Sequence, residues 1–474
     1  MNAPASTAQL LAIAPRPVPQ ALLDALTQRF GAQFSTSLAV REQHGRDESP
    51  FTDAPPPAGV VFAENTQDVA DAVKLANQHE VPVIAWGAGS SLEGHLLAVQ
   101  SGITIDVNRM NRVLSVNADD LTITVQPGIT RKQLNDAIKD QGLFFPIDPG
   151  ADASIGGMTA TRASGTNAVR YGTMRENVLA LEVVTASGEV IRTGTRARKS
   201  SAGYDLTRLM VGSEGTLGLF TEITVRLYPL PEAVSAAICS FPSIEAAVRT
   251  VIETIQLGVP IARVELLDAN AVRGVNHYSK LTLREQPLLL MEFHGSPASV
   301  KEQAETVQEI ASEHGGADFE WADTPEERSR LWTARHNAYF AAVASRPGCR
   351  CITTDTCVPI SRLADALLDS VDEANASRIP YFLVGHVGDG NFHMGYLIDP
   401  DDADERARAE QLNHQLVARA LKLGGTCTGE HGVGLHKMGF LVDEAGAGSI
   451  DMMRAIKRAL DPKNILNPGK IFAL

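Results

Sequence analysis

Two short segments near the end of the chain hold the residues best suited to chemistry. Residues 385–393 read Gly-His-Val-Gly-Asp-Gly-Asn-Phe-His, and residues 429–434 read Gly-Glu-His-Gly-Val-Gly. The dipeptide Asp389-Gly390 predicts a two-residue type I′ hairpin turn, because both central residues of that turn must tolerate positive φ. His386 would then lie directly opposite His393, with Cβ atoms roughly 4.5–5.5 Å apart.

Two imidazoles at this separation suit a single divalent metal. Glu430 would add a carboxylate, which gives a two-histidine, one-carboxylate set with open positions for a substrate. Zinc, manganese and iron all accept these ligands. His431, beside the carboxylate ligand, would serve as a general base. The geometry alone leaves a second interpretation open, in which both histidines only satisfy hydrogen bonds within a sheet.

Composition and charge exclude several classes of protein. The 474 residues are 44% hydrophobic and 21% charged, as expected for a globular protein of two or three domains. A net charge of −14 argues against nucleic acid or anionic lipid as the main partner. Five cysteines without a C-x-x-C pair indicate reduced thiols. With no apolar run near the ~20 residues of a membrane span and no signal pattern, we expect a cytoplasmic location, with peripheral contact at the inner membrane face left open.

The pattern of helix and strand signals predicts an α+β protein with four parts. Residues 1–50 are predicted to form an N-terminal helical segment and linker, and residues 51–231 a domain in which strands and helices alternate. Residues 232–424 favour an antiparallel sheet with helices on one face, which would be a separate cap domain carrying the hairpin. Residues 425–474 are predicted to form a C-terminal segment that completes the active site and the 51–231 domain.

Three loops rich in glycine and small hydroxyl residues punctuate the predicted 51–231 domain. They lie at residues 87–94, 146–157 and 212–218. The first follows a strand but does not fit a dinucleotide fingerprint, because Leu92 stands where the third glycine belongs and no helix begins there. Its backbone N–H groups and serine hydroxyls would still make a nest for a pyrophosphate. The other two loops would let the backbone approach a large flat ligand.

The three loops, in this order, resemble the FAD-binding domain of the vanillyl-alcohol oxidase / p-cresol methylhydroxylase family. Residues 331–338, 346–349 and 354–361 resemble the 2-hydroxyacid dehydrogenase branch of that family, and its cytochrome-linked D-lactate dehydrogenases in particular. The resemblance covers residues 50–474. It implies an FAD-binding domain of two subdomains, with the flavin extended between them.

The resemblance also implies which residues hold the flavin. The pyrophosphate would lie on the first loop, at Gly87, Ala88, Gly89, Ser90, Ser91 and Gly94. The ribityl chain and the ring would be lined by Pro149, Gly150, Ser154, Gly156, Gly157, Thr161 and Gly165, the adenosine by Glu214, Gly218 and Ile223, and Asn467 would reach the flavin from the C-terminus. Some family members bind FAD covalently through a histidine in the first loop. This chain has Ser90 there and His95 comes too late, so non-covalent FAD is expected.

The implied reaction is metal-assisted oxidation of a D-2-hydroxyacid, D-lactate to pyruvate in the first instance. Hydride would pass to the flavin, and electrons then to cytochrome c or a quinone. Arg335 would bind the substrate carboxylate through its planar fork, although a helix-surface salt bridge is the other interpretation of this residue. Asn391 would orient a ligand or the substrate, or else form the turn. A homodimer is left open.

Alternatives remain within and outside the family. A glycolate oxidase FAD subunit shares most of these motifs. A D-2-hydroxyglutarate dehydrogenase would need a further cationic or polar group, whereas this chain offers Ala338, Tyr339, Phe340 and Thr353, which favours a monocarboxylate. The alternative of another class is a non-redox metal hydrolase or ligand-binding protein, in which the glycine loops would have no purpose.

Overall fold

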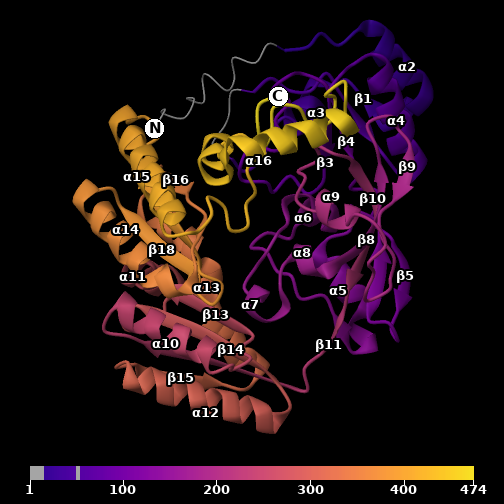
Figure 1. Cartoon of the computed structure of the whole chain (residues 1–474). Coiled ribbons are helices and arrows are strands. Elements are labelled where there is room, and N and C mark those ends of the chain that lie inside the picture. The colour runs from indigo at the N-terminus through magenta and orange to yellow at the C-terminus, as the bar shows by residue number, and fades with distance from the viewer. Residues whose placement is uncertain (1–14, 50–53) are drawn as a thin grey trace. The chain divides into compact units, whose positions relative to one another are not determined.

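The structure, a computed structural model, describes residues 15–49 and 54–474. Residues 1–14 of the predicted N-terminal segment, and residues 50–53 around its end, lie outside the described residues. The chain divides into two compact units (Figure 1). The first unit is assembled from Met1–Ser164, Gly172–Leu230 and Glu430–Leu474, and the second from Gly165–Tyr171 and Pro231–Gly429.

A small sheet near the start of the chain opens the first unit. Its strands β1 (Phe34–Ser35), β2 (Gly59–Phe62), β4 (Ile103–Asp106) and β3 (Val83–Trp86) are hydrogen-bonded in that order. β2 and β3 both pair with β4 in parallel. Parallel strands need crossover helices, and α4 (Thr66–Gln78) provides one, beginning where the Asn65 side chain caps the N–H of Asp68. Its apolar face packs with Leu22 and Leu26 of α2 (Gln20–Phe30).

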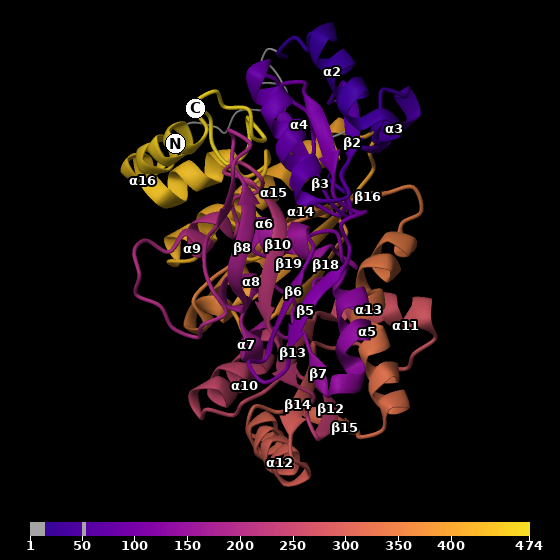
Figure 2. The same cartoon turned by 90° about the vertical axis from the view of Figure 1, so that its right-hand side faces the viewer.

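A second, antiparallel sheet completes the body of this unit. Its order is β5 (Val113–Asn117), β6 (Thr122–Val125), β10 (Leu219–Arg226), β8 (Val178–Val184) and β9 (Val190–Arg192), and Figure 2 shows the first four of these strands side by side. One core joins Ile123 and Ile223 of the sheet to Leu134 of α5 (Arg131–Ile138) and Met158 of α6 (Ile155–Thr161). Shorter elements are α3 (Leu38–Gln43), β7 (Leu143–Phe144), α8 (Met174–Asn177), α9 (Leu206–Met210) and β11 (Tyr228–Pro229).

The C-terminal segment returns to the first unit, as predicted. It forms α16 (Met438–Leu460), which is broken by a non-helical Gly446, and then runs beside β3. The Val83 N–H donates to the Ile465 carbonyl, and the Asn467 N–H donates to the Val83 carbonyl. The described helices include none that is both long and apolar enough to cross a membrane.

An antiparallel sheet forms the centre of the second unit. Its strand order is β15 (Ala317–Ala322), β12 (Ala233–Ser240), β14 (Leu288–Gly295), β13 (Arg263–Leu267), β18 (Tyr381–His386), β19 (Asn391–Ile398) and β16 (Arg350–Thr353), with β17 (Thr356–Cys357) also pairing with β19. All eight residues of β19 are buried, and so are all but the last residue of β14. Burial of consecutive residues means that both faces of the sheet are covered.

Helices cover both faces of this sheet, whereas the sequence predicted them on one. Ile238 and Leu290 point toward α11 (Ala269–Ser279) and α13 (Pro325–Ser345), and α10 (Ile244–Gln256) and α12 (Pro297–Glu313) lie on the opposite side (Figure 2). α14 (Leu363–Ser377) packs against α10, α15 (Ala403–Lys422) packs against α14, and α7 (Ala168–Tyr171) lies near β13. The α+β class is confirmed. Helical periodicity identifies a helix but does not say which face of a sheet it will cover.

Candidate active site

The predicted hairpin forms, but its register differs from the prediction. His386 pairs with Asn391, and His393 pairs with Val384, so a four-residue loop at 387–390 replaces the two-residue turn. A type I′ turn needs positive φ at both central residues, and of Asp389 and Gly390 only the glycine has it, at +79°. A Cβ on Gly390 would lie 2.0 Å from the Val358 carbonyl oxygen, so the loop packs closely on that segment. The prediction that His386 faces His393 directly is therefore wrong.

The two histidines meet nevertheless, as diagonal neighbours. A register shift of two residues keeps both side chains on the same face, and the ring centroids are 5.4 Å apart. Nδ1–H of His386 donates to Oε1 of Glu265 at 2.7 Å, and Nδ1–H of His393 donates to the Thr354 carbonyl at 3.0 Å. In a neutral ring the lone pair then belongs to Nε2. Both histidines therefore have the tautomer that binds a metal through Nε2.

Glu265 is the residue of this cluster that the sequence analysis missed. It is completely buried in β13, and besides His386 it accepts a 2.7 Å hydrogen bond from Nε of Arg335. Burial alone would raise the pKa of Glu265, but the nearby imidazole and guanidinium outweigh it and the pKa is lowered. Arg335, on α13, is thus in an ion pair with a buried carboxylate and not at the helix surface.

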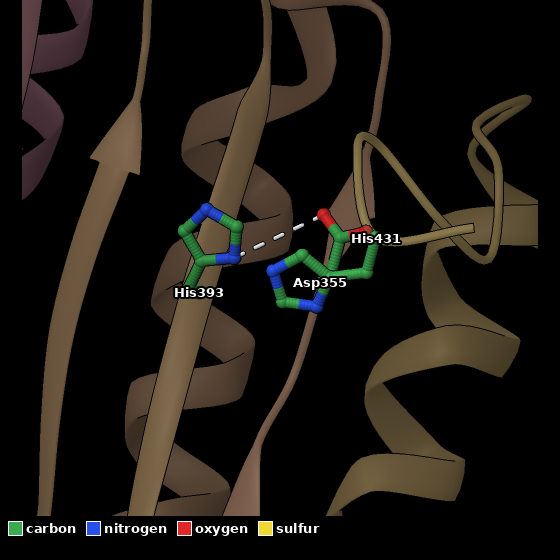
Figure 3. A group of neighbouring side chains, drawn as sticks. All are labelled: Asp355, His393 and His431. Carbon is green, nitrogen blue, oxygen red and sulfur yellow. Dashed lines mark ion pairs between the residues drawn. The ribbon is translucent and has the colours of Figure 1, made fainter. Parts of the chain in front are cut away.

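A second buried carboxylate, Asp355, organises the segment that leads to Glu430. It accepts hydrogen bonds from Nδ2 of Asn391 at 2.8 Å, from the Thr428 hydroxyl at 2.8 Å and from the Gly429 N–H at 2.9 Å. Figure 3 shows its contact with His393, whose Nδ1 lies 3.8 Å from Oδ1 of Asp355. The Asn391 amide therefore holds Asp355. Asp355 in turn fixes the backbone up to the residue that precedes Glu430.

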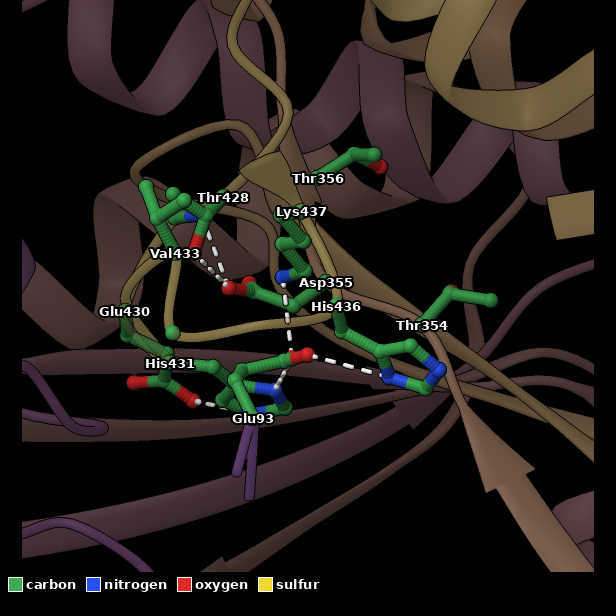
Figure 4. A network of polar contacts seen from close by, with 12 residues as sticks. Glu93, Thr354, Asp355, Thr356, Thr428, Glu430, His431, Val433, His436 and Lys437 are labelled. Atoms are coloured by element: carbon green, nitrogen blue, oxygen red, sulfur yellow. Dashed lines mark hydrogen bonds and ion pairs between the residues drawn. The ribbon is translucent and has the colours of Figure 1, made fainter. Parts of the chain in front are cut away.

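In the first unit, the predicted base His431 lies beside a buried acid. Its Nδ1 is 3.4 Å from Oε1 of Glu93, and the same carboxylate contacts Lys437 at 3.2 Å and His436 at 3.4 Å (Figure 4). Burial opposes the ionisation of Glu93, but Lys437 and the two histidines outweigh it, so its pKa lies well below the usual range. Glu93 is therefore an anion beside one edge of the His431 ring.

The three glycine loops converge within the first unit. A Cβ on Gly87 of the first loop would lie 2.3 Å from the Ser154 hydroxyl of the second. The N–H groups of Gly212 and Glu214, in the third loop, donate to the carbonyls of Thr159 and Ala160 just after the second. The loops that were expected to share one ligand thus lie next to one another.

The other residues predicted to bind the cofactor lie in several different parts of the fold. Glu214 is buried and accepts from the Val433 and Gly434 N–H groups, and Asn467 Nδ2 donates to the Glu214 carbonyl. Ile223 faces the core of the antiparallel sheet, and Gly218 packs against Val183. Gly165 belongs to the second unit, unlike the second glycine loop that precedes it in the chain.

Comparison with known proteins then identifies the family. Residues 57–194 match the model of an FAD binding domain, and residues 230–471 match that of the C-terminal domain of FAD linked oxidases. The chain belongs to the FAD-linked oxidases. The first two glycine loops lie in the part that matches the FAD-binding domain, the third lies between the two matched parts, and both hairpin histidines lie in the part that matches the C-terminal domain.

Known proteins match this FAD-linked oxidase in sequence or in fold along nearly its whole length. A probable mitochondrial D-lactate dehydrogenase from Danio rerio is 49% identical over 93% of this chain and 89% of its own length. A mitochondrial D-lactate dehydrogenase [cytochrome] from Arabidopsis thaliana is 45% identical over 96% of this chain and 80% of its own. A solved structure of p-cresol methylhydroxylase matches with a TM-score of 0.76 at 18% identity, over 98% of this chain and 99% of that one. The predicted family is confirmed, and the last match confirms its fold.

Proposed function

We propose that the chain is a D-lactate dehydrogenase that oxidises D-lactate to pyruvate and passes the electrons to cytochrome c. The observation that carries this proposal is the 49% and 45% identity to D-lactate dehydrogenases over more than nine-tenths of the chain. The hydroxyl proton and the Cα hydride of the substrate must both leave. The site residues divide these tasks.

FAD would be held without a covalent bond by the three glycine loops. FAD, when bound, supplies the hydride acceptor that no side chain can provide. The close contact of Gly87 with Ser154 supports the fit, because the loops bring backbone N–H groups and hydroxyls together where larger side chains would not fit. His95 is buried, and its Nε2 lies 3.2 Å from Oε2 of Glu214 in an ion pair. The residues predicted from the resemblance remain our proposal for the binding site.

His386, His393 and Glu430 would hold a divalent metal, which we propose to be zinc, manganese or iron. A metal bound there supplies a Lewis acid for the hydroxyl and carboxylate of the substrate. The tautomers of both histidines fit this use, since each Nδ1–H is committed to a protein acceptor. Glu430 follows Gly429, whose N–H is held by Asp355, which supports the carboxylate as the third ligand.

His431 would take the hydroxyl proton. The Glu93 carboxylate on the Nδ1 side favours the tautomer with the proton on Nδ1, so that Nε2, which lies 4.0 Å from Oε1 of Glu430, would carry the lone pair of the base. Arg335 would hold the substrate carboxylate through the Nη1–Nη2 edge of its guanidinium. Asn391 would act indirectly, through Asp355. Ala338, one turn after Arg335, is buried among apolar side chains, which supports a substrate without a second carboxylate.

We also propose the electron acceptor, the oligomeric state and the cellular location of the protein. We favour cytochrome c over a quinone because the Arabidopsis relative is a D-lactate dehydrogenase [cytochrome]. We propose a cytoplasmic location for this chain, whereas the Danio and Arabidopsis relatives are mitochondrial. A homodimer is retained as the assembly to be tested by light scattering.

The deciding experiment is an anaerobic titration of the purified protein while the visible absorbance of the flavin is followed. D-lactate should bleach it, whereas L-lactate, glycolate and D-2-hydroxyglutarate should leave it unchanged. Bleaching by glycolate or by the glutarate would replace D-lactate with that substrate. A colourless protein would instead support a non-redox metal hydrolase or ligand-binding protein and would overturn the proposal.

A further inference from the structure

Glu265 links the two groups that the proposed reaction needs in the second unit. One carboxylate oxygen accepts from Nδ1 of His386 and the other from Nε of Arg335, each at 2.7 Å. The carboxylate has no solvent exposure, so it pays a large desolvation cost that only good partners offset. Both of its oxygens are thus engaged by functional side chains.

Each hydrogen bond fixes one property of its donor. An acceptor at Nδ1 keeps the proton on that nitrogen of His386 and orients the ring, so that Nε2 faces away with its lone pair. The bond to Nε holds the guanidinium of Arg335 by one side, which presents the opposite Nη1–Nη2 edge for a bidentate carboxylate. The two effects come from the same rigid group on a central strand.

We propose that Glu265 is a positioning residue shared by the metal site and the substrate-carboxylate site. This inference rests on the proposed function, since it takes His386 as a ligand and Arg335 as the carboxylate-binding residue. It goes further by making the two sites depend on one side chain. A change at Glu265 should therefore weaken metal binding and substrate binding together, through two separate donors.

Glu265→Gln is the sharpest variant, because an amide has only one acceptor oxygen. It can satisfy either the Arg335 donor or the His386 donor, but the other then faces an NH₂ group. The matched control is Glu292→Gln on the neighbouring strand β14. Glu292 is also buried, contacts Nε2 of His294 at 2.7 Å and lies 3.5 Å from Nε of Arg263, and it has no part in the proposed reaction.

The first measurement is the affinity of the flavin-loaded, chelator-stripped protein for Mn²⁺ and Zn²⁺, by competition with a fluorescent chelator. E265Q should bind the metal about 10–100-fold more weakly, as for loss of other carboxylates behind a ligating histidine. The second measurement is the KM for D-lactate at saturating metal. In E265Q it should still be roughly tenfold higher than in the wild type, because one charge-assisted hydrogen bond is lost. E292Q should match the wild type in both.

The results of these two measurements distinguish a shared positioning role of Glu265 from a structural role, and both from a failure of the proposed function. If E265Q and E292Q behave alike, Glu265 is structural and the inference is overturned. If saturating metal restores the KM of E265Q, Glu265 acts through His386 alone and the shared role is overturned. A wild-type protein that binds no metal, or is not reduced by D-lactate, would refute the proposed function itself. If E265Q does not fold with flavin, Glu265→Asp, which keeps the charge but shortens its reach, is judged by the same two readouts.

Discussion

At the scale of single residues, His431 is the side chain on which proton removal depends. Its replacement by asparagine should lower kcat by roughly 10²–10⁴-fold, the usual contribution of a general base. FAD content should not change. Stopped-flow bleaching of the flavin by D-lactate measures the step directly. His436→Asn is the control, because His436 contacts the same Glu93 carboxylate but is 36% exposed. Equal losses in both variants would show that His431 serves only the buried cluster.

The candidate site could be predicted from sequence only in part, and the residues show why. His386, His393 and His431 stand in glycine-rich motifs that indicate chemistry without a structure. Glu265 gives a weaker signal, as one acid within the apolar strand run Arg263–Leu267. Its role depends on partners about 70 and 121 residues further along the chain, a distance that no local pattern spans.

At the scale of elements, the ion pair of His95 and Glu214 joins the end of the first glycine loop to the third. Burial alone would lower the pKa of His95, but Glu214, with Asp47 and Glu93, raises it above the ordinary value of 6.5. The pKa of Glu214 is lowered despite its burial, chiefly by His95. The histidine therefore stabilises the fold fully below pH 6.5 and less as pH rises through its folded pKa. The acid stabilises it above pH ~4.5 and less as pH falls.

The stability of the flavin-loaded protein should therefore be greatest between about pH 4.5 and 6.5 and should decline above that range. This stability can be measured by heating the protein at a series of pH values from 5 to 9 and recording the rise in fluorescence as the flavin is released. Each 1 kcal/mol lost lowers Tm by about 2–4 °C for domains of 150–250 residues. His95→Gln should have a lower Tm at pH 6 and a flatter profile above it. If the Tm of the variant changed with pH in parallel with that of the wild type, the His95–Glu214 pair would be excluded as the cause of the pH dependence.

In the hairpin, the strands could be predicted from the sequence but their register could not. Both strands were predicted from the Asp-Gly signal, and both form. The register predicted with them was wrong, because it depends on the fit of Gly390 against Val358, and that residue lies about thirty positions earlier in the chain. Strand existence is a local property, whereas register depends on what the loop packs against.

At the scale of the whole molecule, the order of segments in the chain is not the order of segments in space. The first unit draws on three separate stretches, and the crossing residues Gly165–Tyr171 belong to the second. Arg170 donates to the carbonyls of Pro260 and His294, which ties this short segment to a sheet whose first strand in chain order begins at Ala233. Such pairings are tertiary, so composition and periodicity could predict the α+β class but not this exchange.

Net charge is the whole-molecule property that bears on the electron acceptor. With 42 basic and 56 acidic residues, the chain carries −14 at neutral pH, which attracts a positively charged cytochrome c over long distances. The second-order rate of cytochrome c reduction by the D-lactate-reduced enzyme should therefore fall at least tenfold between ~10 mM and ~150 mM salt, as the Debye length shortens from about 30 to 8 Å. Reduction of a neutral quinone is the control and should not change. A salt-independent rate with cytochrome c, together with fast quinone reduction, would favour the quinone as the acceptor.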